Sequence, residues 1–412
     1  MPRIKPFCAL KPAASLLAKV VTRPLEHYSM GQARLIASEN PVSFLHLINP
    51  ELDNPYLRGS RQELVFKKIN ENLDDFIERQ VLVTEELPAI YIYQVKHDGL
   101  LQTGIWTLTH INDYLEGHIK KHEHTVERRE KLLAEYLQQT DLDANPVLIT
   151  YHPNAQVKSI MEKYIAQKPA IDFCFADATE HRVWTINNPD DLTLLIDAFA
   201  QIPAVYIADG HHRAASMAKM GLHKRARHAN NEAAEFNYFS TVYMDTQEVK
   251  VLEYNRLVRD LAGLTEEEFL GVLAAAFEVE KMPIPFKPTI LHEFGMCLKS
   301  GWYKLKAKPH LYSDDPVGCL DVSVLQDHIL LPILHINDPR TDARITFEGG
   351  KTPLSELEKQ VNNGTNAVAF VLVPTAIAQL INVADADKVM PPKSTWVEPK
   401  FLVGLLSHHF KG

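Results

Sequence analysis

The residues best suited to chemistry lie in segment 204–221, which reads Ala-Val-Tyr-Ile-Ala-Asp-Gly-His-His-Arg-Ala-Ala-Ser-Met-Ala-Lys-Met-Gly. This pattern predicts a buried strand, a tight turn at Asp209-Gly210 and an alanine-rich helix that ends at Gly221. The unpaired N–H groups of a helix's first turn and the helix dipole attract anions. A glycine in the turn would also let a phosphate approach the backbone closely. The segment therefore predicts a phosphate site.

The side chains of the same turn support this prediction. Arg213 offers a planar fork of donors for phosphate oxygens, His211 and His212 add further donors, and Asp209 adds a carboxylate at the edge of the site. Two alternatives stay open. Asp209 and the histidines could simply cap the helix. A metal site is the weaker alternative, because neighbouring side chains of a helix diverge by about 100°.

A second segment, 117–125, reads Gly-His-Ile-Lys-Lys-His-Glu-His-Thr and precedes an amphipathic helix expected at 126–139. Glu123 lies among lysines and histidines, which favour the ionised carboxylate. It could accept a proton from a substrate hydroxyl or help to hold a divalent cation. Thr125 or His124 could cap the helix. The alternatives are a solvated charged loop, and a transition-metal site formed by His122 and His124.

A third segment, 389–400, contains Pro-Pro-Lys-Ser-Thr at 391–395. Its prolines stiffen the backbone, so Lys393, Ser394 and Thr395 could be held in place at little entropic cost on binding. Lysine suits phosphate, and the two hydroxyls suit phosphate or a small polar substrate. The alternative is an ordinary turn near the end of the chain.

The elements that must position these segments alternate between strand and helix patterns, which indicates an α/β protein. A helix is expected at 60–82, and a hairpin at 90–106 is indicated by Asp98-Gly99. Further expected elements are buried strands at 147–151 and 367–373, hairpins at 238–254 and 296–307, and helices at 321–334 and 375–383.

Composition excludes several classes of protein. The chain has 412 residues, 46% of them hydrophobic, which excludes a disordered or fibrous chain. Lys+Arg total 43 against 52 Asp+Glu, a net charge of −9, which disfavours a nucleic-acid-coating protein. Four scattered cysteines, no signal-peptide pattern and no long apolar run predict a cytoplasmic protein that is not associated with a membrane. Nineteen histidines are a surplus, and five of them fall in the first two segments.

The three segments occur in an order that resembles the free serine kinases of the ParB/sulfiredoxin-like superfamily. The chain looks still closer to a widespread bacterial family, a domain of unknown function, that carries the Ala-Asp-Gly-His-His-Arg motif. The residues that carry the resemblance are Ile207 to Arg213, Lys121 to Glu123 and Pro392 to Thr395. It covers roughly residue 109 to the C-terminus.

The resemblance implies a kinase that transfers a phosphoryl group from ATP or ADP, with Mg²⁺, to the hydroxyl of a free amino acid, L-serine. It implies that Glu123 and Asp209 are catalytic, with Glu123 the base. The phosphates would bind at Gly210, His211, His212 and Arg213, and no protein metal ligand is assigned. The acceptor would bind at His122, Thr125, Lys393, Ser394 and Thr395. The fold implied is a ParB/sulfiredoxin-like nucleotide-binding core (111–280), an added N-terminal α+β region (1–110) and a C-terminal α/β lobe (281–412).

Departures from the pattern keep other functions open. His211 replaces the cysteine that sulfiredoxins need, and His211-His212 replaces Glu-Arg of the partition proteins. The extra residues 1–110 could reshape the acceptor pocket. One alternative is a ParB-like switch that binds or hydrolyses a nucleotide without kinase activity. Another is a hydrolase or redox protein with a histidine-bound metal. Nucleic acid is not expected as a partner.

Overall fold

The computed structural model describes residues 2–57, 62–228 and 231–410. The chain forms two compact units. Unit 1 contains residues 1–120, 125–249 and 399–412, and unit 2 contains residues 121–124 and 250–398. These units divide the chain differently from the predicted boundaries near residues 110 and 280. The reason is that β4 (Ile90–His97) and β5 (Leu100–His110), from the predicted N-terminal region, pair inside the main sheet of unit 1.

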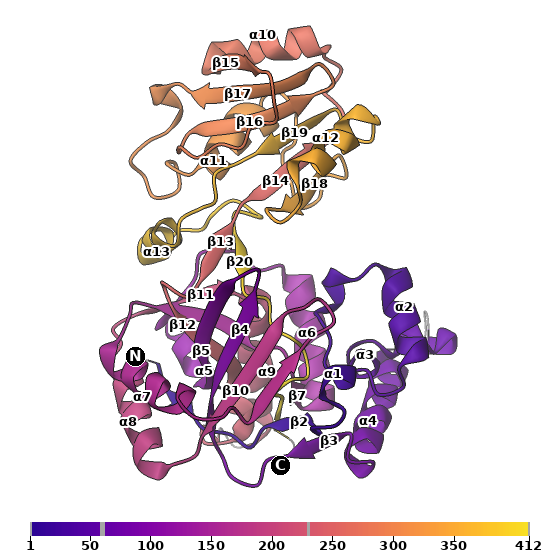
Figure 1. Ribbon diagram of the computed structural model, residues 1–412, viewed down its shortest axis with the longest axis vertical. Coiled ribbons are helices and arrows are strands. Elements are labelled where there is room, and N and C mark those ends of the chain that lie inside the picture. The colour runs from indigo at the N-terminus through magenta and orange to yellow at the C-terminus, as the bar shows by residue number, and fades with distance from the viewer. Residues whose placement is uncertain (1, 58–61, 229–230, 411–412) are drawn as a thin grey trace. The chain divides into compact units, whose positions relative to one another are not determined.

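Unit 1 is built on a nine-stranded mixed sheet in the order β6-β11-β8-β12-β5-β4-β10-β9, with β1 paired to β5 (Figure 1). The pairs β6/β11 and β8/β12 are parallel and the other pairs are antiparallel. The remaining strands are β1 (Ile4–Lys5), β6 (Ile119–Lys120), β8 (Val147–Tyr151), β9 (Ile171–Cys174), β10 (Glu180–Ile186), β11 (Val205–Asp209) and β12 (Tyr238–Asp245). Two small ladders pair β2 (Leu10–Pro12) with β3 (Leu82–Thr84), and β7 (Leu142–Asp143) with β21 (His408–His409).

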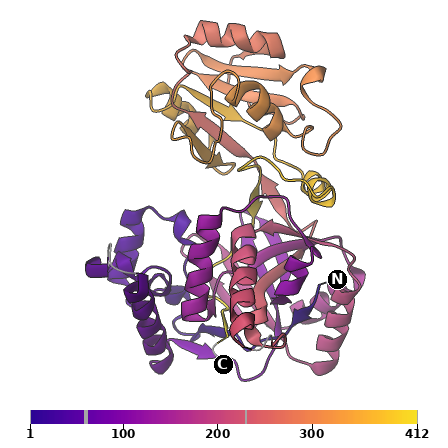
Figure 2. The same ribbon diagram turned by 180° about the vertical axis from the view of Figure 1, so that it is seen from behind.

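Helices cover this sheet. Figure 2 shows α6 (Glu127–Thr140) and α9 (His211–Arg227) side by side, and α9 contacts β8 and β12. The other helices of the sheet are α5 (Ile111–Leu115), α7 (Ala155–Ile165) and α8 (Pro189–Ala200). A group of N-terminal helices packs in two further clusters, one around Phe44, Leu73 and Phe76 and one in which Ala33 and Ala37 meet Leu45 and Leu52. It comprises α1 (Leu17–Val20), α2 (Met30–Glu39), α3 (Leu45–Ile48) and α4 (Gln62–Glu78), with short 3₁₀ turns η1 (Leu25–His27), η2 (Pro50–Leu52) and η3 (Pro55–Leu57).

Unit 2 has a six-stranded sheet in the order β15-β17-β16-β19-β14-β18. Alternate residues of its strands enter two different cores, as the pleat of a strand requires: Met296 packs in one core and Cys297 in the other, beneath α12. Its strands are β14 (Tyr254–Val258), β15 (Phe277–Met282), β16 (Glu293–Leu298), β17 (Gly301–Ala307), β18 (Ile345–Gly349) and β19 (Val368–Val371), and β13 (Lys250–Leu252) pairs with β20 (Trp396–Glu398). Its helices are α10 (Glu266–Ala276), α11 (Asp321–Leu325), α12 (Leu354–Asn362) and α13 (Ile377–Asp385).

The α/β class, both buried strands, the helices near 126–139 and 375–383 and the hairpins at 90–106 and 296–307 are confirmed. The hairpin expected at 238–254 is wrong, because β12 has β5 on one edge and β8 on the other, so β13 pairs with β20 instead. The helix expected at 321–334 is shorter: α11 ends at Leu325 and a π-helical turn, η6 (Gln326–Leu330), follows ahead of Pro332. The helix expected at 60–82 is α4, which ends at Glu78; its expected start falls outside the described residues.

Gly221 does not end α9, which continues to Arg227. A Cβ atom at Gly221 would lie 2.4 Å from Cδ1 of Ile111, so this glycine lets α5 approach α9 closely. Among the described residues, no helix has both the length and the apolar character needed to cross a membrane.

Candidate functional site: the turn between β11 and α9

The predicted strand, turn and helix around Gly210 are present. β11 ends at Asp209 and α9 begins at His211, with Gly210 as the N-cap at φ 100° and ψ 29°. This left-handed conformation is strained for residues with a side chain. The N-cap residue itself is a glycine, so it has no side chain that could accept a hydrogen bond from the first turn.

Arg213 folds back over its own turn. Its Nη2 donates to Oδ2 of Asp209 at 2.7 Å, and its Nη1 donates to Oδ1 of Asn145 at 2.7 Å and to the carbonyl of Pro146. A Cβ atom at Gly210 would lie 2.9 Å from the guanidinium group. Glycine is thus required here by Arg213 as well as by the backbone. The Arg213 side chain is four-fifths buried, and part of its donor set is committed to the protein itself.

Lys400, which lies near the C-terminal end of the chain, also contacts this turn. Its Nζ lies 3.2 Å from Oδ1 of Asp209, so both carboxylate oxygens contact cations. Burial opposes the charged form of Asp209, but the charges of Lys400 and Arg213 outweigh it and hold the pKa of this carboxyl well below its usual range. Asp209 is therefore a fixed anion and a poor proton acceptor. It is also a poor metal ligand, because its two oxygens are already ion-paired.

Sequence reasoning missed Lys400 and Asn145 as parts of this turn. Each had a weak signal. Asn145 stands two residues before the buried strand β8, and Lys400 ends the proline-rich stretch at 389–400. Neither signal indicates the partner, because Lys400 is 191 residues from Asp209 in the chain.

The two histidines of the turn differ in their surroundings. His211 is buried, with 4% of its surface exposed. Nε2 of His212 accepts a hydrogen bond from the backbone N–H of Val126 at 2.9 Å, so this nitrogen does not donate to an anion in the same state. Val126, and not Thr125 or His124, is the N-cap of α6.

Thr125 and Lys219 both contact Glu130, and the contact of Lys219 links α6 to α9. The hydroxyl of Thr125 donates to Oε1 of Glu130, and Nζ of Lys219 on α9 lies 2.9 Å from Oε2 of the same carboxylate. The hydrogen bonds from Lys219 and then Thr125 lower the pKa of Glu130. The Thr125 hydroxyl, predicted to bind substrate, is thus engaged within unit 1.

A second carboxylate, that of Asp143, is close enough to Arg213 to be influenced by its charge. Asp143 on β7 is buried and accepts a hydrogen bond from the backbone N–H of Ser240 at 2.8 Å. Burial raises the pKa of Asp143 to about 6, against the opposing effects of that hydrogen bond and of the charges of His408 and Arg213.

The other predicted residues belong to unit 2. His122 is buried, and its carbonyl accepts a hydrogen bond from the N–H of Met390 at 2.8 Å. His124, two residues on, is exposed. Glu123 is half-buried. The pKa of Arg340 is raised mainly by Asp338, and the charge of Glu123 adds to this effect.

Lys393, Ser394 and Thr395 form a tight turn in unit 2. Lys393 has φ 58°, and its carbonyl accepts a hydrogen bond from Nη2 of the buried Arg256 at 3.0 Å. The Ser394 hydroxyl is buried and donates to the carbonyl of Pro391 at 2.5 Å. The backbone carbonyl of Ser394 accepts a hydrogen bond from the Thr375 hydroxyl at 3.1 Å. The Ser394 hydroxyl thus holds the turn together, while Lys393 is exposed and lies over the Tyr254 ring.

Comparisons with known proteins give one family and several distant likenesses. A family model described as "Protein of unknown function (DUF1015)" matches residues 4–323. No curated protein matches the chain. A variant of a free serine kinase in complex with AMP has a TM-score of 0.39 and 12% identity over 73% of this chain and 91% of that one. SbnI with a C-terminal truncation, from Staphylococcus aureus, has a TM-score of 0.38 and 12% identity over 74% and 87%.

A conserved hypothetical protein from Pyrococcus furiosus has a TM-score of 0.37 and 14% identity over 72% of this chain and 91% of that one. All of these TM-scores are below 0.5.

Proposed function

The chain belongs to the DUF1015 family, and we propose that it is a small-molecule kinase, which transfers a phosphoryl group from ATP or ADP to the hydroxyl of a free amino acid. The acceptor we propose is L-serine, which would become O-phosphoserine. The observation that carries the proposal is the charge of the turn before α9. There, Lys400 and Arg213 contact the single carboxylate of Asp209, at the N-terminus of α9.

This charge arrangement suits the phosphates of a nucleotide. The N–H groups at the start of α9 and the helix dipole favour an anion, and two cations against one carboxylate leave the turn positive. We assign the phosphates to Gly210, His211, His212 and Arg213. Asp209 would keep the guanidinium of Arg213 and the ammonium of Lys400 in position. Such preorganisation removes the cost of ordering both cations when the nucleotide binds.

Phosphoryl transfer needs positioning, charge neutralisation and one group to take a proton. We assign the last role to Glu123, because Asp209 is ion-paired through both oxygens. The acceptor hydroxyl would lose its proton to Glu123 as its oxygen bonds to the terminal phosphorus. The bond from that phosphorus to the bridging oxygen would break, and the nucleotide would leave with the electron pair. The acceptor would be held by His122, Thr125 and Lys393 to Thr395.

Mg²⁺ usually accompanies a nucleotide and is held by one or two carboxylates together with the phosphates. Asp209 does not fit as such a ligand, since both of its oxygens contact cations.

The test is a panel of free amino acids, including L-serine, incubated with ATP, ADP or pyrophosphate and followed by phosphorus NMR. We expect a phosphomonoester signal with L-serine and one of the nucleotides. Glu123→Gln should lower the transfer rate about 10²- to 10⁴-fold while nucleotide affinity stays within about twofold. Glu356→Gln, a half-exposed glutamate of α12, is the matched control and should change neither.

Two results would contradict the proposal. Full transfer activity in Glu123→Gln would remove Glu123 as the base. Nucleotide binding without transfer to any amino acid would favour the ParB-like switch, which would bind or slowly hydrolyse the nucleotide.

A further inference from the structure

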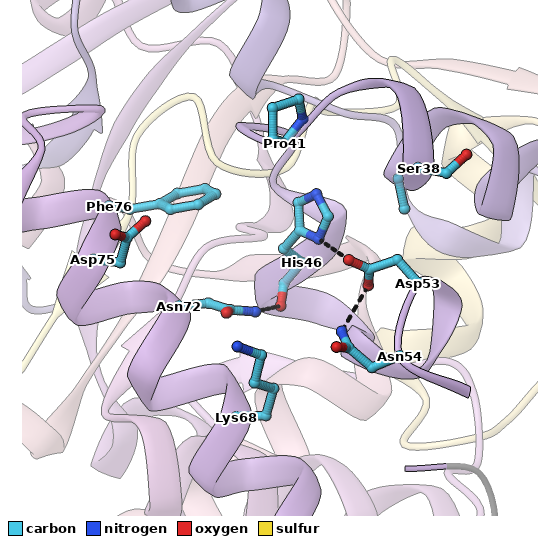
Figure 3. A pocket seen from close by; sticks show the side chains of 10 residues that line it. Ser38, Pro41, His46, Asp53, Asn54, Lys68, Asn72, Asp75 and Phe76 are labelled. Carbon is cyan, nitrogen blue, oxygen red and sulfur yellow. Dashed lines mark hydrogen bonds and ion pairs between the residues drawn. The ribbon is translucent and has the colours of Figure 1, made fainter. Parts of the chain in front are cut away.

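A cavity of about 430 Å³ lies among the N-terminal helices of unit 1 (Figure 3). Its walls come from the end of α2, from α3, from the turn after η2 and from α4. The volume falls in the range of small-molecule sites. None of its lining residues belongs to the three segments discussed above, so it is a separate feature of the molecule.

One wall of the cavity carries a fixed carboxylate. Oδ2 of Asp53 lies 3.2 Å from Nδ1 of His46, and Oδ1 of Asp53 accepts a hydrogen bond from Nδ2 of Asn54 at 3.0 Å. His46 is itself held, because its Nε2 lies 3.0 Å from the carbonyl of Asn40. Two carboxylate oxygens offer about four acceptor positions. Asp53 can therefore accept N–H donors of a ligand while keeping both of these contacts.

The facing wall carries a cation. Lys68 and Asn72 are one turn apart on α4, so they lie on the same side of the helix. Nδ2 of Asn72 donates to the carbonyl of His46 at 3.1 Å, which fixes this wall to α3. Among the described residues, the carboxylate that pairs with Lys68 is that of Glu71, at a long 3.9 Å. Figure 3 shows the Lys68 ammonium directed into the space beside Asn72.

Apolar surface lies between these two walls. Phe76 follows Asn72 by one helical turn, is buried, and meets the His46 ring edge-on at a centroid distance of 6.4 Å. Pro41 lines the same cavity. A second carboxylate, Asp75, is paired with Arg79 at 2.7 Å, so it does not cancel the charge of Lys68.

We propose that this cavity binds a free α-amino acid with an apolar side chain. The ligand's carboxylate would meet Lys68, its ammonium would meet Asp53, and its side chain would cover Phe76 and Pro41. A ligand with only one charge would pair with either Lys68 or Asp53 and leave the other without a partner on the ligand, which lowers its affinity. The proposal does not depend on the kinase activity, and the site is distinct from the one proposed for the acceptor.

The experiment is titration calorimetry on the full chain with L-valine, L-leucine and L-methionine. The comparison probes are isoamylamine and 4-methylpentanoate, which keep the leucine skeleton but carry only the amine or only the carboxylate. We expect at least one amino acid to bind about tenfold or more tightly than either probe, as the loss of one charge-assisted hydrogen bond predicts.

Variants tie this binding to the cavity. Lys68→Met and Asp53→Asn should each weaken the amino acid about tenfold. Lys67→Met is the matched control, because Lys67 is the neighbouring lysine, is 73% exposed and also lies 3.9 Å from Glu71; it should bind normally. Glu123→Gln should also bind normally, which separates this site from the proposed acceptor site. Lys68→Met tests the proposal even if loss of Asp53 disturbs the fold around His46.

Three results would overturn the proposal: no saturable binding by any of the three amino acids, equal binding of a singly charged probe, or unchanged binding in Lys68→Met.

Discussion

The guanidinium of Arg213 donates to the carboxylate of Asp209 at 2.7 Å, four residues back along the chain, and Lys400 meets the other oxygen of that carboxylate at 3.2 Å. A single acidic side chain thus orders two cations at the start of α9. These two ion pairs engage both oxygens of the Asp209 carboxylate.

Gly210→Ala should break this arrangement. The new Cβ would lie 2.9 Å from the guanidinium of Arg213, and φ of 100° strains any residue with a side chain. We expect Arg213 to leave Asp209 and the affinity for ADP to fall about tenfold, as measured by calorimetry. Gly117→Ala is the control, since Gly117 also has positive φ (77°) but has nothing within 4 Å of its Cβ position. Equal loss in both variants would mean that backbone strain alone is responsible.

Lys400→Met should weaken nucleotide binding, because the turn loses one of its two cations. The expected loss in ADP affinity is about tenfold, and Lys400→Arg should restore most of it. The readout is again calorimetry, with Lys131→Met as a control at a lysine that is 67% exposed on α6. Normal ADP binding by Lys400→Met would show that the charge of Lys400 serves only the fold.

Asp143→Asn should make unit 1 more stable at alkaline pH. The folded protein raises the pKa of Asp143 from 3.8 to about 6, so between about pH 4 and pH 6 it binds more protons than the unfolded chain. Stability from the protonated form is therefore present at low pH and is lost as pH rises through about 6. A pKa difference of this size between the folded and the unfolded chain corresponds to ~3 kcal/mol in the free energy of unfolding.

Asp143→Asn carries no charge at this position, so it does not lose stability as the pH rises. Its free energy of unfolding in urea should exceed that of the wild type by up to ~3 kcal/mol at pH 8 and match it near pH 4. Asp98→Asn, at a side chain that is 80% exposed, should show no such dependence. A difference between Asp143→Asn and wild type that is constant with pH would contradict the assignment.

Gly221→Ala should destabilise the contact between α9 and α5. Its Cβ would overlap Cδ1 of Ile111 at 2.4 Å, and overpacking of this kind costs ~1–3 kcal/mol. Ile111→Val removes that methyl group, so the double variant should be more stable than the sum of the two single effects predicts. The measurement is a double-mutant cycle in urea. Additive effects would mean that the α9 backbone moves to admit the new methyl group.

Local pattern in the sequence predicted the strand, the Asp209-Gly210 turn and the helix that follows, because each depends on neighbouring residues. Apolar runs mark a buried strand, only glycine adopts a left-handed turn without strain, and alanine favours a helix. The hairpins at 90–106 and 296–307 were predictable for the same reason. The position of Gly221 was misread, since a glycine that ends a helix and a glycine that admits a neighbouring helix have the same local sequence.

Only the tertiary structure decided what the side chains of the turn do. Arg213 was expected to face a ligand, but Asn145, Pro146 and Asp209 engage much of its guanidinium. Lys400 reaches Asp209 across 191 residues, and no periodic pattern encodes a pairing at that separation. The sequence by itself determined which residues could form a phosphate site, because composition and local conformation are properties of short segments. The tertiary structure determined which charges are already balanced, because ion pairs form between segments that folding brings together.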